Sequence, residues 1–179
     1  SNTLYDFDLS NIFNVKVGGV SGMDSIFVNK NGNEDFVYSK THTTGNTRKM
    51  YYNVKNAFME SKKEKLLKRK LKTFDESNWW LWGRDFLKNN NKRIYVNCKT
   101  RKDNPFFTHS CKNFDGSILA LFLKDQTLDE KRCAIILNSI DWSDLGFKVG
   151  GRYCFSQKAL ENTKIPKKIA KKLLTSKAK

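Results

Sequence analysis

Few residues of the sequence have the types and spacing that catalysis requires. Asp35 with Glu60 and Lys62 fits the loosest spacing of a nuclease site, in which acidic side chains hold a metal ion beside a lysine. Glu60 and Lys62 fall in a charged run with helical spacing, which favours a solvated helix face. The only two histidines, His42 and His109, lie in no recognised nucleophile motif. A metal-dependent endonuclease segment therefore stays an alternative, and a hydrolase with a nucleophile triad is not expected.

The four cysteines are spaced too irregularly for a metal or disulfide motif. Cys98, Cys111, Cys133 and Cys154 are separated by 13, 22 and 21 positions, which gives neither a C-x-x-C pair nor the density of a secreted disulfide scaffold. His109 could join Cys98 and Cys111 around zinc, but this spacing matches no usual ligand pattern. The sequence therefore predicts reduced thiols, a cytoplasmic location and no metal site.

Two further motifs are weak signals for cofactor or methyl-transfer chemistry. The glycine-rich residues 18–22 match neither the dinucleotide pattern G-x-G-x-x-G nor the P-loop pattern, and a tight turn explains them better. Asn104-Pro105-Phe106-Phe107 partly matches the Asn-Pro-Pro-Tyr/Phe catalytic tetrapeptide of amino-methyltransferases, but the second proline is missing and no cofactor loop accompanies it. We expect this segment to be an aromatic anchor after a turn. No cofactor is expected in this chain.

A strong excess of positive charge points to a polyanionic partner. The 179 residues include 34 basic and 18 acidic side chains, which gives a formal net charge of +16 and favours nucleic acid or another anionic surface. Eight basic and two acidic residues between Arg84 and Lys112 are interleaved with aromatic residues, as expected where cations meet phosphates or base edges. Residues 99–102 are the first candidates for such contacts. The basic residues 62–72 and the lysine-rich tail are candidates for attraction that is independent of DNA sequence.

Three tryptophans within four positions suggest a third hypothesis. Trp79, Trp80 and Trp82 could stack on RNA bases or form a surface that docks another protein. The simpler interpretation is packing in the core, which we expect for at least two of the three.

The chain as a whole is expected to form one α+β domain with one core, residues 1–179. Its length suits a single domain, and strands and helices mix without a regular βαβ rhythm, which indicates a mixed or antiparallel sheet with flanking helices. No run of about 18 apolar residues exists, so no membrane span is expected. The chain begins Ser1-Asn2 without a methionine, and we interpret it as a fragment of a longer protein.

Hydrophobic periodicity and turn residues predict the individual elements. Strands are expected near residues 12–17, 26–28, 36–38, 93–99, 117–124 and 147–155, with 117–124 central. Asn31-Gly32 predicts a type I′ hairpin turn, Gly150-Gly151 predicts a bulge or tight turn, and residues 40–49 are expected to be a polar loop. Helices are expected over residues 57–74, over about twelve residues after a capping box from Thr127 to Glu130, and after Pro166.

Several segments, taken in order, carry a resemblance to a known family. Residues 17–28 contain the pattern G-x-x-S-G-x-x-x-x-F, and further recognisable segments lie at residues 40–49, 79–85, 93–97, 104–107 and 137–157. Together they resemble the C-terminal target-recognition region of bacterial N6-adenine DNA methyltransferases of restriction-modification systems, of the Taq type. The likeness extends from about residue 15 to residue 166.

The resemblance implies a division of labour within a longer parent protein. A catalytic methyltransferase domain, with its S-adenosylmethionine loop and catalytic tetrapeptide, would precede this segment in the same chain. The segment itself would be a monomeric, non-catalytic module that holds double-stranded DNA and reads bases near the adenine that the enzyme extrudes.

The charge pattern and the resemblance together give a set of candidate DNA-binding residues. Arg48, Arg84, Arg101 and Arg152 are expected at bases or phosphates. The full set is Ser21, Gly22, Lys40, Thr41, Thr44, Arg48, Lys49, Trp82, Arg84, Lys99, Arg101, Lys102, Lys112, Arg152 and Gln157.

Overall fold

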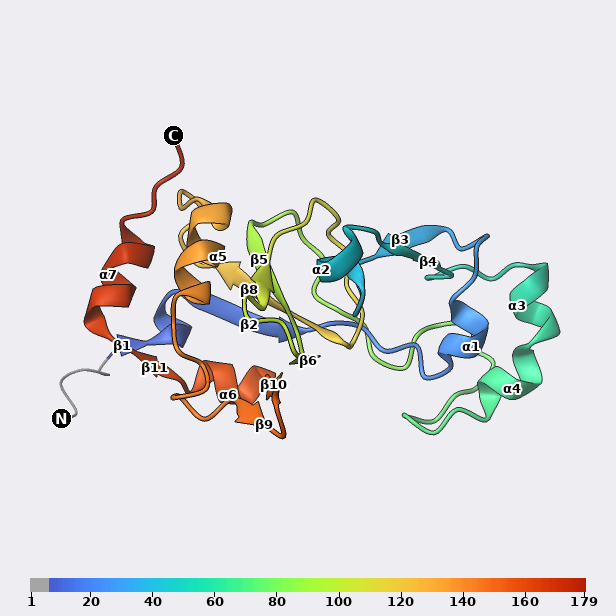
Figure 1. Ribbon diagram of the computed structural model, residues 1–179. Helices are drawn as coiled ribbons and strands as arrows, with labels where there is room; N and C mark the ends of the chain where they lie inside the picture. Colours follow the sequence, from blue (N-terminus) through green and yellow to red (C-terminus); the bar gives the residue numbers. More distant parts are fainter. Residues whose placement is uncertain (1–6) are drawn as a thin grey trace.

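A four-stranded antiparallel sheet forms the centre of the computed structural model, which describes residues 7–179 (Figure 1). Its strand order is β2-β8-β5-β7, and the strands cover Phe13–Val17, Ile118–Leu123, Arg93–Asn97 and Phe106–Phe107. Strand β8 pairs along its length with both β2 and β5. The predicted central strand and the α+β class are therefore confirmed. Ser1 and Asn2 lie outside the described residues.

Apolar side chains cover both faces of this sheet, so the molecule has two cores where one was expected. Every residue of β8 is buried, and its alternate side chains point to opposite faces. Leu119 and Leu121 belong to one core cluster, whereas Ala120 and Phe122 belong to the other. The prediction of a single core was wrong, because a strand that is apolar at every position contributes buried side chains to both faces of the sheet.

Helices near the C-terminus cover the first core. α5 (Glu130–Asn138), α6 (Gln157–Glu161) and α7 (Lys167–Leu174) lie on this side together with the short strands β1 (Phe7–Asp8) and β11 (Lys164–Ile165) and the 3-10 turn η2 (Leu9–Asn11). α5 begins at Glu130, later than the capping box predicted, since that pattern starts at Thr127. Its cap is Asp129, whose carboxylate accepts hydrogen bonds from the backbone N–H groups of Lys131 and Arg132, because an aspartate satisfies these free donors well. Within residues 7–179, no helix combines the length and apolar character that crossing a membrane requires.

The second core lies under small elements from the first half of the chain. These are α1 (Asp24–Phe27), β3 (Glu34–Phe36), α2 (Thr41–Thr44), β4 (Arg48–Met50), α3 (Ala57–Ser61) and α4 (Lys63–Leu67). The expected polar loop at 40–49 thus contains a helical turn and the start of a strand. Trp79 and Trp82 are buried in this core, which confirms the prediction that at least two of the three tryptophans pack inside.

The strand expected at 26–28 and its hairpin at Asn31-Gly32 are absent. Residues 24–27 form helix α1, and neither Asn31 nor Gly32 has a positive φ. Both Val28 and Glu34 pair with Met50 instead of with each other, and Gly32 lies against the Met50 backbone. A partner strand from a distant part of the chain has therefore replaced the local hairpin.

The helix expected over residues 57–74 ends early. It breaks at Lys62 and stops at Leu67, and Leu71, expected on its apolar face, is 54% exposed. The cause is Arg69, which is buried and donates hydrogen bonds to the carbonyl oxygens of Leu66, Ser21 and Trp79. These bonds draw the chain out of the helical path.

A separate three-stranded sheet has the order β6-β10-β9, with β6 at Lys99–Thr100, β10 at Arg152–Cys154 and β9 at Lys148–Val149. Gly150 and Gly151 join β9 to β10 with φ values of 58° and 82°, a backbone conformation that glycine adopts readily. The predicted tight turn is therefore confirmed.

Candidate nucleic-acid interface

The sheet β6-β10-β9 brings together basic residues that are far apart in the sequence. Cys154 pairs with Lys99 and Tyr153 pairs with Thr100, so Lys99, Arg101 and Arg152 come from neighbouring segments. A Cβ added at Gly151 would lie 3.5 Å from Nη1 of Arg101, which places this guanidinium at the β9–β10 turn. All three cations are exposed, and none forms an ion pair within residues 7–179. They form a surface, here named the basic sheet, that is free to meet an anion.

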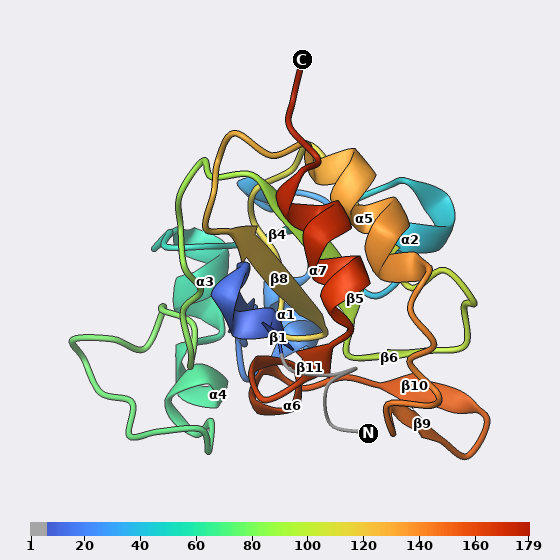
Figure 2. The same ribbon diagram turned by 90° about the vertical axis from the view of Figure 1, so that its left-hand side faces the viewer.

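Helix α2 and the basic sheet both lie on the right-hand side of Figure 2, with α2 above β6 and β10. Figure 1 shows that α2 is separated from β10 along the long direction of the molecule. His42 on α2 stacks on Phe107 with ring centroids 4.6 Å apart, and its Nε2 lies 2.7 Å from the carbonyl oxygen of Asn104. His109 also contacts a backbone carbonyl group, at the C-terminal end of α2: its Nε2 lies 2.9 Å from the carbonyl oxygen of Gly45. Lys40 and Thr44, at the two ends of this helical turn, are exposed.

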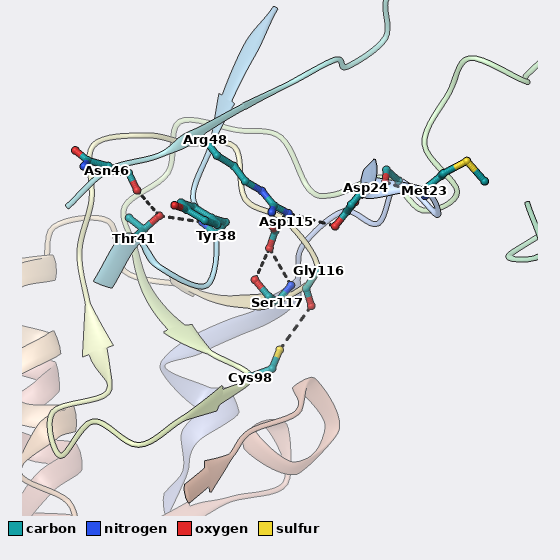
Figure 3. Close-up of polar contacts among 11 residues, drawn as sticks. Met23, Asp24, Tyr38, Thr41, Asn46, Arg48, Cys98, Asp115, Gly116 and Ser117 are labelled. Carbon is teal, nitrogen blue, oxygen red and sulfur yellow. Dashed lines mark hydrogen bonds and ion pairs between the residues drawn. The ribbon is translucent and has the colours of Figure 1, made fainter. Parts of the chain in front are cut away.

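A hollow of about 320 Å³ is lined by Arg48 together with Asp24, Ser39 and Asp115. Nη2 of Arg48 lies 3.2 Å from a carboxylate oxygen of Asp24 and 2.9 Å from one of Asp115 (Figure 3). The guanidinium also lies 4.9 Å from the centre of the Tyr38 ring, within the range of a cation–π contact. Two carboxylates and a ring therefore fix the orientation of this arginine.

Asp115 is the buried anchor of this arrangement. Its carboxylate accepts hydrogen bonds from the backbone N–H of Ser117 at 2.9 Å and from the Ser117 hydroxyl at 2.5 Å, in addition to Arg48. Burial raises the pKa of Asp115 above its usual value, while Ser117 and Arg48 act in the opposite direction. The sequence reasoning missed Asp115, although the run Asp115-Gly116-Ser117 is typical of a turn in which aspartate accepts from its own backbone.

Four of the candidate residues are engaged inside the protein. Ser21 and Thr41 are buried, and their hydroxyls bond with Asp24 and with the carbonyl oxygen of Asn46. Trp82 is 4% exposed, and its indole N–H donates to the carbonyl oxygen of Tyr51. Gln157 accepts a hydrogen bond from the backbone N–H of Val17. These four side chains stabilise the protein from inside.

The remaining candidates are spread around these two features. Lys49 pairs with Asp35 at 3.2 Å, and Arg84 donates to the carbonyl oxygen of Gly18 at 3.2 Å. Gly22 has a φ of 86° and lies near Arg69. Lys102 is exposed, whereas Lys112 is half-buried. The basic residues 62–72 are not part of the same surface, because Figure 2 places α4 on the opposite side of the molecule from β9 and β10.

The residues of the nuclease and zinc alternatives have other partners. Asp35 pairs with Lys49, and Lys62 lies over the Phe58 ring. Nε2 of His109 lies against a carbonyl oxygen, as described above, and the Cys98 thiol faces the carbonyl oxygen of Gly116. In the part of the chain that the structure describes, no three His, Cys, Asp or Glu side chains lie close enough together to hold a metal ion. Phe106 and Phe107 of the tetrapeptide-like segment are buried in β7, as expected of an aromatic anchor.

Comparison with solved structures gives a clear match for the fold. The type IIL restriction-modification enzyme MmeI, solved in complex with DNA, superposes on 89% of this chain with a TM-score of 0.62 and 9% sequence identity. The two proteins share a fold. The matched part is 25% of the MmeI chain, so this chain spans about a quarter of that enzyme.

A second solved structure is more distant. The S subunit of a type I restriction-modification system from M. genitalium matches 93% of this chain and 35% of its own, with a TM-score of 0.45 and 13% identity. No family model matches the sequence, and no curated protein matches it significantly.

Proposed function

We propose that this chain is a DNA target-recognition domain of a restriction-modification protein. The observation that carries the proposal is the fold shared over 89% of the chain with an enzyme solved in complex with DNA. A surface suited to DNA agrees with it, because the basic sheet offers cations that have no acidic partner among residues 7–179, on a chain of net charge +16. Unpaired cations of this kind attract the phosphate backbone of a duplex.

The proposed interface has contacting residues and supporting residues. Lys99, Arg101 and Arg152 contact phosphates, and Lys40 and Thr44 extend the contact along α2. Thr41 stabilises the α2 turn from inside through its bond to Asn46. Ser21, Trp82 and Gln157 are supporting residues, since their side chains bond with Asp24, Tyr51 and Val17 within the protein. Lys102 follows the basic sheet directly in the sequence. The remaining candidates, Gly22, Arg48, Lys49, Arg84 and Lys112, lie outside the basic sheet.

The finer proposal concerns the parent protein. We place this domain in a site-specific adenine-N6 DNA methyltransferase, as the Taq-type sequence resemblance implies. A catalytic domain of the same parent chain would bind S-adenosylmethionine and transfer the methyl group, and the domain described here would act as a non-catalytic monomer. Such a division suits an enzyme that must hold the duplex and extrude one base at the same time.

A selection from randomised duplex DNA tests the proposal. The chain is mixed with a pool of duplexes that carry a random segment, and the bound fraction is sequenced. Enrichment of one short sequence is expected. Retention of all sequences alike, or a preference for structured RNA in a competing pool, would overturn the proposal. Cutting of the pool in the presence of magnesium would instead favour the endonuclease alternative, with Glu60→Ala as the diagnostic variant.

A further inference from the structure

The Arg48 hollow differs from the basic sheet in its electrostatics. Arg48 carries one positive charge, and Asp24 and Asp115 each carry one negative charge within 3.2 Å of it, so the three groups sum to −1. A phosphate brought to this site would meet a net negative charge. Neutral hydrogen-bonding groups, such as the edges of bases, meet no such penalty.

Arg48 also keeps unused hydrogen-bonding capacity. Its Nη2 donates to both carboxylates. Nε is buried without a partner, and Nη1 has no hydrogen-bond acceptor within residues 7–179. The Arg48 side chain is 27% exposed and that of Asp24 is 59% exposed, whereas Asp115 is only 8% exposed. The contact with Asp24 is the longer and more exposed of the two ion pairs, so it is the one that a ligand can exchange.

We propose that Arg48 and Asp24 together read one G·C base pair, an inference that rests on the proposed DNA-recognition function. Arg48 donates through Nη1 and Nη2 to O6 and N7 of the guanine, and Asp24 gives up its bond to Nη2 and accepts from the N4 amino group of the paired cytosine. Arginine with guanine and carboxylate with cytosine are the pairings that the major-groove edges favour. Asp115 and Tyr38 keep the guanidinium in place during this exchange.

The same arrangement rejects an A·T pair. Adenine presents an N6 amino donor where guanine presents the O6 acceptor, so this donor would face the guanidinium donors of Arg48. Thymine presents a carbonyl acceptor and a methyl group, which offer no donor to the Asp24 carboxylate. A G·C pair gives new partners to both the guanidinium and the carboxylate in exchange for their mutual ion pair, whereas an A·T pair gives a partner to neither, and the discrimination follows from that difference.

Base preference and salt dependence together test the inference. The random duplex selection is repeated with Arg48→Lys and Asp24→Asn, and the affinity of each variant for the enriched sequence is measured from 50 to 200 mM salt. Both variants are expected to lose roughly tenfold or more of the discrimination between G·C and A·T at one and the same position. The slope of log affinity against log salt should stay as in the wild type.

A matched control separates base reading from phosphate contact. Lys99→Ala is expected to keep the base preferences and to make the salt slope shallower by about 0.9. Circular dichroism melting of all variants shows whether each is folded, and Asp24→Asn, at an exposed carboxylate, is the variant that decides the question if Arg48→Lys unfolds. The inference fails if both folded variants keep the wild-type preference at every position, or if they change the salt slope alone. Absence of any enriched sequence for the wild type would instead remove the proposed function itself.

Discussion

Two regions of the molecule use arginine in opposite ways. Around α1 and α4, Arg48 and Arg69 are bound by acceptors of the protein itself: two carboxylates for Arg48 and three backbone carbonyl oxygens for Arg69. On the basic sheet, Arg101 and Arg152 are exposed and form no ion pair within residues 7–179. The formal charge of +16 counts these residues equally. The surroundings of each arginine therefore decide whether it is available to phosphates.

Arg69 is the extreme case of an arginine used for structure. It is 5% exposed and stacks on Phe74, with its guanidinium carbon 3.8 Å from the ring centre. Burial lowers the pKa of Arg69 to about 10, which leaves it charged at neutral pH. Its three carbonyl contacts join the end of α4 to the Ser21 turn and to the Trp79 segment, so this one side chain defines the path of the loop that follows α4.

The largest expected effect comes from removing this side chain. Arg69→Ala leaves three carbonyl oxygens without a donor and opens a cavity beside Phe74, and we expect it to lower the free energy of unfolding by about 3 kcal/mol. Urea denaturation of the wild type and the variant measures the difference. Arg101→Ala is the matched control, and it should change stability by less than about 0.5 kcal/mol because its side chain is exposed. Equal stability of the two variants would show that buried and exposed arginines do not differ as described.

The next largest effect is expected on DNA binding. The combined variant Lys99→Ala, Arg101→Ala and Arg152→Ala removes three proposed phosphate contacts, so the slope of log affinity against log salt should become shallower by about 2.7, at about 0.9 per contact. Fluorescence anisotropy with a duplex of the enriched sequence gives the slope. An unchanged slope would mean that the basic sheet does not lie on the DNA.

A smaller effect is expected from the pH dependence of Asp115. Because burial raises the folded-state pKa of this carboxyl above its ordinary value near 4, its contribution to stability is fully present below that pH. The contribution is lost as the pH rises through the raised pKa. Relative to Asp115→Asn, which does not titrate here, the wild type should therefore lose unfolding free energy as the pH rises from about 4. Parallel stability profiles of the two proteins would contradict this.

The smallest effect is expected from the basic loop after α4. Lys68→Ala with Lys70→Ala removes two exposed cations from the loop that follows α4. Helix α4 lies on the side of the molecule opposite β9 and β10 in Figure 2. The salt slope should change by less than it does for any two residues of the basic sheet. A change of about 1.8, the value for two phosphate contacts, would extend the interface to this loop.

Sequence reasoning predicted the elements whose signals are local. The apolar run of β8 and the pair Gly150-Gly151 determine their own conformations, and both were confirmed. The prediction of a strand at 26–28 was wrong, because Val28 and Glu34 both pair with Met50, which lies outside the local sequence. The early end of the helix at Leu67 depends on Arg69 reaching carbonyl oxygens of residues far along the chain, which periodicity does not reveal.

The candidate site shows the same limit. The sequence marked residues 99–102 as an exposed basic segment, but the pairing of β6 with β10, which brings Arg152 beside them, is a contact across more than 50 positions. Arg48 was a candidate for direct contact, while its partners Asp24 and Asp115 were missed, because they lie 24 and 67 positions away. Charge patterns therefore predict the class of partner, and the folded structure shows which cations are free.

The specificity ratio of the wild-type chain tests the central claim most directly. Its affinity for a duplex with the enriched sequence is compared, at one physiological salt concentration, with its affinity for a duplex of the same composition in scrambled order. The account predicts a preference of about 1,000-fold or more, as is typical of specific DNA-binding domains. Equal affinity for the two duplexes would show that the domain holds DNA without reading it.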